Sequence, residues 1–463
     1  MGAYLELVTP GIPLLGAWIY SGPYEIPNYS VTFTGVFTNT TPTDAYRGAG
    51  RPEATYVLER TMDALAKELD MDPIELRRRN FVKEFPHTMA SGLTIDSGDY
   101  VATLDRLLER LDLASIRADQ IARRERGDAK QIGVGFSTYN EMCGLAPSRI
   151  LGAIRYAVGG WDAATIRFQP LGSVQVVVGT SPHGQGHETT FAQIVADQLG
   201  VGVDDIEVIH GDTASSQLGM DTYGSRSLSV GGVALWHAGE KVVAKARTIV
   251  AHQLEVSEED LEFADGTFSV KGSPDRNMSI QAAAFAAHAA HDLPDGMEPG
   301  LEETAVYDPP NFSWPAGAHA AVVEVDIETG DTRLLRYVAV DDVGNPVNPQ
   351  VIDGQVHGGV TQGIGAALYE EGFYDEEGNL LTTTMATYLV PSAAELPSFE
   401  TDRTETAADN PLGVKGVGET GTIAAAPAVI NAVVDALSHL GVTDIGLPAT
   451  PERVWRAIEE VRT

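Results

Sequence analysis

The chain has 463 residues, 43% hydrophobic and 21% charged, a composition typical of a globular protein with room for two or three domains. Its formal net charge of −34 at pH 7 disfavours binding to nucleic acids and to anionic membranes, because both need clustered lysine and arginine. The single cysteine, Cys143, excludes an intrachain disulfide and any iron–sulfur cluster or structural zinc site held by cysteines of this chain.

The first 20 residues are apolar, but they lack a basic leading segment and contain Pro10 and Pro13. They are therefore predicted to form neither a signal peptide nor a membrane-spanning helix. No later stretch reaches 18 uninterrupted apolar residues. We expect a cytoplasmic protein that does not bind a membrane.

Short strands and well-punctuated helices follow one another along the chain. Pro52 suits the first turn of a helix, and Asp72 suits the N-cap of the next one. Because strands and helices do not alternate strictly, the pattern predicts an α+β fold. In chain order we expect a strand at 31–38, a helix from 52, a helix at 74–81, helical segments at 101–127, a strand at 173–179, a helix at 188–199, a strand at 205–210, a helix at 230–254, a hairpin of strands at 320–327 and 332–342, and helices at 355–371, 424–440 and 451–461.

A glutamate framed by glycines stands near the end of the chain, in Gly-Val-Lys-Gly-Val-Gly-Glu-Thr-Gly at 413–421. Glycines let backbone approach a ligand closely, and they leave Glu419 as the reactive carboxylate of the loop. A helix is expected to follow directly, so the loop would lie at a helix N-terminus. Taken alone, such a loop is also compatible with an exposed turn.

Four further glycine-rich segments, at 44–54, 181–190, 221–229 and 355–363, lie before or within expected helices. Each has the chemistry of a cradle for an anion or a polar cofactor, because small residues permit close approach and helix N-termini favour phosphate. None matches a P-loop or a dinucleotide-binding fingerprint. Two simpler interpretations stay open at this point: Arg47 could be an ion-pair partner near a helix, and the i, i+4 pair His183 and His187 could hold a metal, although no third ligand is evident.

Six motifs in order give the chain a resemblance to a known family: DAYRGAGRPEATY, DPIELRRRNFV, GQGHETTFAQIVAD, DTYGSRS, the segment 354–371 and GVKGVGETGT. The chain resembles the molybdopterin-binding large subunit of the xanthine oxidase family of molybdenum hydroxylases, in the branch of the aerobic carbon monoxide dehydrogenase large chain. The resemblance runs through essentially all of the sequence. It implies mixed strand-and-helix cofactor-binding domains, with 1–100 as the C-terminal part of the first, 101–130 as a connector and 131–463 as the second.

The resemblance implies a molybdenum–molybdopterin cofactor, in the cytosine dinucleotide form usual for bacterial and archaeal members. The metal would be held by the dithiolene of the pterin and not by protein ligands. Glu419 matches the family's general base, and Arg47 and Gly224 match positions near the metal. The residues implied to bind the cofactor are Arg47, Gly48, Gly184, Gln185, Gly186, Gly224, Ser225, Ser227, Gln362 and Lys415.

The implied reaction is the oxidative hydroxylation of a small molecule, an aldehyde or an N-heterocycle, with water as the source of oxygen. The electrons would pass to an iron–sulfur small subunit and an FAD medium subunit. Those partners are expected because one cysteine cannot hold the clusters and no flavin-binding segment is apparent.

Two departures from the family pattern shape these expectations. Members that oxidise carbon monoxide carry a copper-binding cysteine where this chain has Gly48, so a soft ligand for copper is missing there. Family large subunits are also longer, and the resemblance begins in mid-protein. We therefore expect the C-terminal portion of such a subunit, working with a chain or segment that supplies the N-terminal half. The alternatives are a carbon monoxide dehydrogenase large chain and a non-catalytic truncated remnant or assembly component.

The loop at 140–149 is expected to help select the substrate, since pocket shape governs specificity. Cys143 lies in this loop. It could line the substrate pocket or be a buried packing residue.

Overall fold

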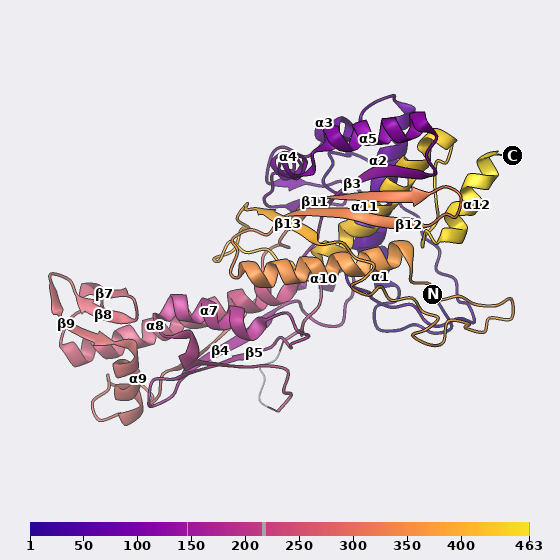
Figure 1. The fold of residues 1–463 in the computed structure, drawn as a ribbon. Helices are drawn as coiled ribbons and strands as arrows, with labels where there is room; N and C mark the ends of the chain where they lie inside the picture. Colours follow the sequence, from indigo (N-terminus) through magenta and orange to yellow (C-terminus); the bar gives the residue numbers. More distant parts are fainter. Residues whose placement is uncertain (146, 215–218, 463) are drawn as a thin grey trace.

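The computed structural model describes residues 1–145, 147–214 and 219–462. The chain forms two lobes joined end to end (Figure 1). Both termini and the last third of the chain belong to the larger lobe, and the middle of the chain forms the smaller one. This mixture of sheets and helices confirms the α+β expectation.

A four-stranded sheet in the order β13-β12-β11-β3 lies at the centre of the larger lobe. Its elements and the helices that cover it are β3 (Lys130–Asn140), β11 (Ala316–Asp326), β12 (Thr332–Asp342), β13 (Phe399–Thr404), α2 (Arg51–Glu68), α4 (Tyr100–Leu111), α10 (Pro349–Leu368) and α11 (Thr420–Leu437). Successive side chains of a strand point to opposite faces. Ala321 and Val323 of β11 therefore enter the core formed with α10 and α11, whereas Ala318 and Ala320 enter the core formed with α2 and α4.

The smaller lobe is built on a second four-stranded sheet, β10-β4-β5-β6, covered by two long helices. A small sheet and one more helix complete this lobe beyond the end of the longer covering helix (Figure 1). The elements are β4 (Asp162–Phe168), β5 (Val174–Val178), α7 (His187–Leu199), β6 (Ile206–Ile209), α8 (Val233–Leu254), β7 (Leu261–Ala264), β8 (Thr267–Val270), β9 (Ser273–Ser279), α9 (Ile280–Ala289) and β10 (Glu302–Tyr307).

The remaining elements lie around these two sheets. The segment expected as a connector forms α4 and α5, separated at Asp112, which has φ +39 and accepts a hydrogen bond from the Ser115 amide. Both helices pack on the large sheet, and the domain boundaries stay a prediction. The other elements are α1 (Gly11–Trp18), α3 (Pro73–Asn80), β1 (His87–Thr88), β2 (Thr94–Ile95), α5 (Leu113–Arg126), α6 (Ser148–Ala153) and α12 (Pro451–Arg462).

The expected helices and hairpin are confirmed with small shifts of their ends, but the strand expected at 31–38 is wrong. Its β-branched and aromatic residues find no partner strand, and Phe33 and Phe37 are exposed. In the two large sheets, strands β3, β4, β10 and β13 were not expected, and neither were the short strands β1, β2, β7, β8 and β9. The helix expected from 230 begins at Val233, after a π-helical turn at Ser227–Gly232.

One stretch, Thr420–Leu440, is long and apolar enough to cross a membrane. Within this fold 72% of its most apolar window is buried, because α11 packs against the large sheet and against α10 and α2. Its composition is thus explained by a place in the core.

Candidate active site

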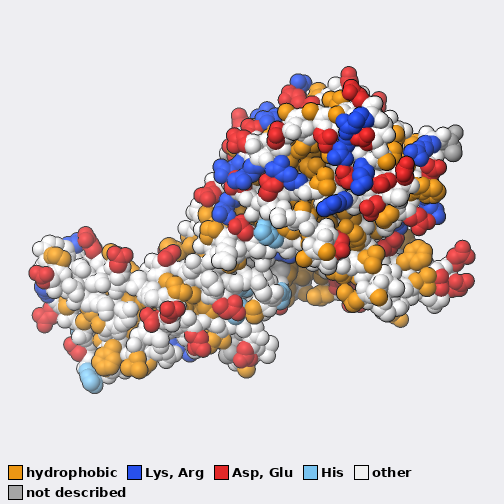
Figure 2. Space-filling view, viewed as in Figure 1, with side chains coloured by type: hydrophobic (Ala, Val, Ile, Leu, Met, Phe, Trp, Pro, Cys, Tyr) orange, Lys and Arg blue, Asp and Glu red, His pale blue; other side chains and the backbone are white. Residues whose placement is uncertain are grey.

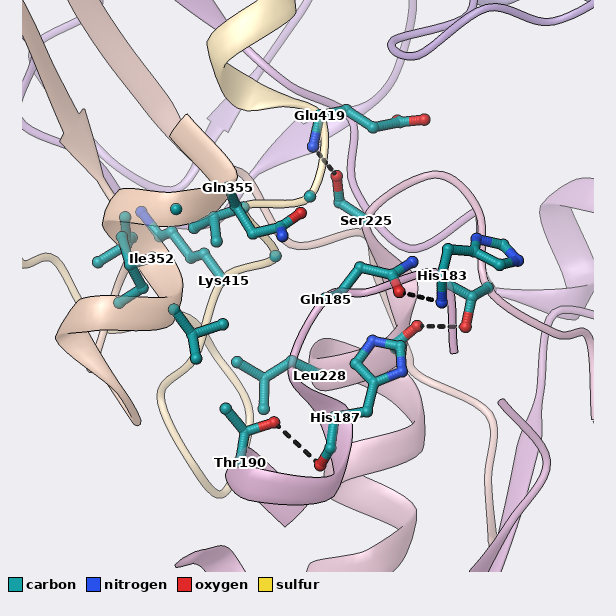
Figure 3. A pocket seen from close by; sticks show the side chains of 18 of the residues that line it. His183, Gln185, His187, Thr190, Ser225, Leu228, Ile352, Gln355, Lys415 and Glu419 are labelled. Atoms are coloured by element: carbon teal, nitrogen blue, oxygen red, sulfur yellow. Dashed lines mark hydrogen bonds between the residues drawn. The ribbon is translucent and has the colours of Figure 1, made fainter. Parts of the chain in front are cut away.

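All five glycine-rich segments meet at one cavity of about 580 Å³, which residues of both lobes line. Figure 3 shows side chains around it from four of these segments, with Gln185, Ser225, Gln355 and Glu419 among them. The walls come from the loops that precede α7, the π-helical turn and α11, from the first turns of α10, and from the loop before α2. This volume lies within the range of ordinary ligand pockets. The residues of the cavity expected from the sequence are Arg47, Gln185, Gly224, Ser225, Ser227, Lys415 and Glu419.

Arg47 ties three of these segments together. Its Nε donates to the carbonyl of Gly418 at 2.6 Å, and its Nη1 donates to Oε1 of Gln362 at 3.0 Å. Its Nη2 donates to the carbonyl and to Oε1 of Gln355, at 3.2 and 3.0 Å. The Arg47 guanidinium therefore fixes the loop that carries Glu419 against α10.

Glu419 occupies the N-cap position of α11. Its amide donates to the hydroxyl of Ser225 at 3.0 Å, and its side chain is 14% exposed. In this structure its carboxylate forms an ion pair with Arg51, the first residue of α2.

A second carboxylate, Glu141, lies behind the same arginine. Its Oε1 is 3.9 Å from Nη2 of Arg51, and both side chains are fully buried. Burial, together with the charge of Glu419, raises the pKa of Glu141 to about 8 against the opposing effect of Arg51. Neither Glu141 nor a role for Arg51 could be predicted from the sequence, because their partners are distant in the chain.

The turn at Gly224 and Ser225 has positive φ at both residues, +57° in each case. The loop 413–421 passes so close to it that a Cβ on Gly416 would lie 1.9 Å from the Ser225 carbonyl. Position 416, where the two loops touch, therefore requires glycine. In the same turn, the hydroxyl of Ser227 forms a hydrogen bond with that of Thr222 at 2.9 Å.

The loop before α7 presents Gln185 to the cavity, and α7 presents its first residue, His187 (Figure 3). Gly184 and Gly186, with φ of +93° and +72°, shape the turn, and Oε1 of Gln185 accepts from the amide of His183. Burial, and then the neighbouring His210, lowers the pKa of His187 to about 4. Over the described residues, no group of three or more His, Cys, Asp or Glu side chains could hold a metal.

Four expected residues do not line the cavity: Gly48, Gly184, Gly186 and Gln362. Gln362 acts through Arg47, as a hydrogen-bond acceptor. Gly48 has φ +103°, and a Cβ there would lie 2.4 Å from Cγ of Pro52. A residue with a side chain at this position would therefore require a different loop conformation.

The ammonium of Lys415 does not face the cavity. It donates to Oδ2 of Asp342 and to the hydroxyl of Thr406, each at 2.8 Å, and the Lys415–Asp342 pair is buried. The cofactor-binding role of Lys415 stays a prediction, and its charge is already balanced within the fold.

Cys143 lies behind the loop 413–421. It lines a cavity of only about 20 Å³, and its thiol donates to the Ser225 carbonyl at 3.2 Å. Burial raises its pKa to about 12. The packing interpretation of Cys143 is therefore the one that fits. The described residues of the loop 140–149 do not line the large cavity, and Ala146 lies outside the described residues.

Comparison with known proteins gives a consistent assignment. The molybdopterin cofactor-binding domain family matches the chain twice, at residues 106–397 and 1–81. The carbon monoxide dehydrogenase large chain of Hydrogenophaga pseudoflava is 42% identical over 96% of this chain and 55% of its own length. The nicotine 6-hydroxylase large subunit of Paenarthrobacter nicotinovorans is 38% identical over 95% of this chain and 54% of its own length.

Solved structures agree with the sequence relatives. A Cu,Mo carbon monoxide dehydrogenase superposes with a TM-score of 0.90 at 38% identity, covering 96% of this chain and 56% of that one. Quinoline 2-oxidoreductase from Pseudomonas putida 86 superposes with a TM-score of 0.93 at 37% identity, covering 99% and 59%. The chain thus spans little more than half the length of these relatives. It belongs to the molybdopterin cofactor-binding family, as a portion of a large subunit of the xanthine oxidase type.

Proposed function

We propose that this chain is the catalytic portion of a molybdenum hydroxylase that oxidises an aldehyde or an N-heterocycle with water as the source of oxygen. The observation that carries the proposal is the convergence of Glu419 with Arg47, Gln185 and the Gly224–Ser225 turn at one cavity. Relatives named for nicotine and for quinoline support the heterocycle class.

The residues around the cavity fit a molybdopterin dinucleotide. The start of α7, with Gln185 and two glycines of positive φ, offers a helix N-terminus and close backbone approach for phosphates. Ser225 and Ser227 would add hydroxyl contacts, and we propose the cytosine form of the dinucleotide. The molybdenum centre, when bound, supplies the two-electron oxidation.

In this mechanism Glu419 is the general base. It would accept the proton of the oxygen nucleophile that water supplies, while Arg47 holds its loop in place through the Gly418 carbonyl. The remaining chemistry of the chain is binding and the exclusion of water around the substrate.

Oxidation of carbon monoxide is less favoured than hydroxylation, although relatives of that name are 42% and 39% identical. Gly48 stands where copper would need a thiolate, and its backbone conformation suits glycine. The thiol of Cys143 is buried behind Gly416. Neither residue therefore offers copper a soft ligand at the large cavity.

The direct test is Glu419→Gln in the purified enzyme complex, with molybdenum content measured beside turnover. Loss of a general base lowers turnover by roughly 10²–10⁴-fold. The proposal expects that loss at unchanged molybdenum content. Full turnover in the variant would remove Glu419 from the mechanism, and a metal-free wild type would favour the non-catalytic remnant.

We also propose that the N-terminal half of the subunit, present as another chain or segment, covers an apolar face of the larger lobe. Two stretches with little regular structure, 1–46 and 372–390, run side by side there, joined by bonds such as Tyr374 to Thr41. Figure 2 shows hydrophobic side chains gathered over this part of the molecule. The exposed side chains of the apolar face are Tyr4, Leu5, Leu7, Val31, Phe33, Val36, Phe37, Tyr46, Phe373, Leu380, Leu381, Met385, Leu389 and Val390.

The occupant of this apolar face follows from the lengths of the relatives, which extend well beyond the matched part. Exposed patches of this kind usually mark interfaces. Phe33→Asp combined with Phe37→Asp should abolish co-purification with the N-terminal half, whereas Leu171→Asp, at a 96% exposed site on the other lobe, should not. Equal recovery with both variants would contradict this placement. We also propose that an iron–sulfur subunit and an FAD subunit complete the assembly. The proposed location of the assembly is the cytoplasm.

A further inference from the structure

A buried arginine lies between two glutamates behind the cavity. Nη2 of Arg51 pairs with Glu419 and is also 3.9 Å from Oε1 of Glu141. Arg51 is the first residue of α2, Glu419 directly precedes α11 and Glu141 directly follows β3, so the fold brings the three together from distant segments.

The hydrogen bonding of this cluster is incomplete. Nε and Nη1 of Arg51 and both carboxylate oxygens of Glu141 are buried without a hydrogen-bond partner in the described part of the chain. The Ser225 hydroxyl lies near Glu141 and favours its ionised form. Buried polar groups are nearly always satisfied, so these atoms have the capacity to bond to one another if the cluster rearranges.

The charges point to the same conclusion. Glu141 is fully buried, and the guanidinium of Arg51 beside it is already paired with Glu419, which lines the cavity. Burial therefore favours the protonated form of Glu141 in the observed state. The raised pKa of Glu141 agrees with this assignment.

The observed pairing is unsuited to catalysis by Glu419. The Glu419 carboxylate is held by Arg51, so it must leave Arg51 to reach a substrate in the cavity. A buried arginine left without a counter-ion is strongly unfavourable. Glu141 is the carboxyl group placed to replace Glu419.

We propose that Glu141 is a positioning residue that takes over Arg51 when Glu419 turns toward the substrate. This inference rests on the proposed function of Glu419 as the base. The pair of carboxyl groups holds one proton before and after the step. Glu141 passes its proton to the neighbouring Ser225 hydroxyl, which lines the cavity and gives its own proton to water there, and Glu419 gains a proton from the oxygen nucleophile; the reverse transfers restore the starting state.

Few ionisable groups act on Glu141. The cations are Arg51 of α2 and Arg47 of the loop before α2. The acidic or neutral groups are Glu419 before α11, Tyr139 of β3 and Cys143 after β3.

Glu141→Gln tests the exchange, because Gln keeps the neutral shape of the side chain but cannot become the counter-ion of Arg51. In the enzyme complex we expect kcat to fall on the order of 10–100-fold, the scale of a misplaced catalytic group. The pH at which the basic limb of kcat is half-maximal should shift, while KM and molybdenum content stay near wild type. Glu141→Asp should recover part of kcat.

A second measurement, on the chain without cofactor, does not depend on activity. The pKa of Glu141 is raised to about 8 in the folded chain, above its unfolded value. The contribution of this carboxyl group to folding stability is therefore complete below the unfolded pKa and is lost as the pH rises toward 8. The free energy of unfolding of the wild type should therefore fall, relative to Glu141→Gln, between pH 5 and pH 8.

The outcomes separate this inference from the proposed function. If Glu141→Gln keeps the wild-type kcat and pH profile while Glu419→Gln is inactive, the exchange is wrong and the base assignment stands. A stability change without any shift in the pH profile would also overturn it, since it would give Glu141 a purely structural role. Full activity of Glu419→Gln would overturn both.

Discussion

The guanidinium of Arg47 donates from Nε to the carbonyl of Gly418 at 2.6 Å, directly before the glutamate proposed as the base. The two residues are 371 positions apart in the sequence. Their contact joins the loop before α2 to the loop before α11. The position of Glu419 thus depends on a residue from the opposite end of the chain.

Arg47→Lys should lower kcat on the order of 10–100-fold, because a lysine cannot make the forked set of bonds to Gly418, Gln355 and Gln362. Steady-state kinetics of the complex would measure the change. Arg79→Lys, which alters an exposed pair with Glu75, is the matched control and should leave kcat unchanged. Equal kinetics for both variants would show that Arg47 does not position the loop.

Gly416→Ala should destabilise the chain by about 1–3 kcal/mol, because the added Cβ would overlap the Ser225 carbonyl. Urea unfolding gives the change in the free energy of unfolding. Gly152→Ala, in α6 with nothing within 4 Å of its Cβ, is the control and should be neutral or slightly stabilising. A neutral Gly416→Ala would mean that the two loops are not packed as closely as described.

Lys415→Met should cost about 3–5 kcal/mol of unfolding free energy, because Asp342 would be left buried without its cation. Lys130→Met removes an exposed pair with Glu324 and should cost no more than about 1 kcal/mol. Molybdenum content distinguishes the alternative. If Lys415 binds the cofactor instead, the variant would lose metal and keep its stability.

The stability of the chain should fall on acidification partly through His187. Its folded pKa, about 4, lies below the unfolded value, so its stabilising effect is complete above about pH 6.5 and is lost as the pH falls toward 4. His187→Gln should flatten the decline of the unfolding free energy between these values. His237→Gln, at a more exposed site on α8, should not. Parallel curves for the wild type and His187→Gln would contradict the assignment.

The cavity could be anticipated from sequence because each of its walls has a local signal. Glycine and serine clusters stand directly before apolar helical runs, and so the loops around Gln185, Gly224 and Glu419 were expected at helix N-termini, where the structure has them. The shared motifs then pointed to one cofactor.

The cluster behind the cavity could not be anticipated, because it depends on which distant segments the sheet brings together. Glu141 follows a strand that was not expected, and Arg51 stood out only as part of a motif. The strand predicted at 31–38 was wrong for a related reason. A β-branched and aromatic composition forms a strand only where a partner strand is available, and this stretch is exposed without one. Likewise, nothing in the sequence pairs Lys415 with Asp342.

The most direct test of the proposed function is to purify this chain with its partners from its own cells and to measure molybdenum together with turnover of aldehydes and N-heterocycles. For a catalytic portion of a molybdenum hydroxylase we expect about one molybdenum per chain, co-purification of the N-terminal half with iron–sulfur and flavin subunits, and turnover that Glu419→Gln abolishes without loss of metal. A chain recovered alone, without molybdenum and without turnover, would contradict it.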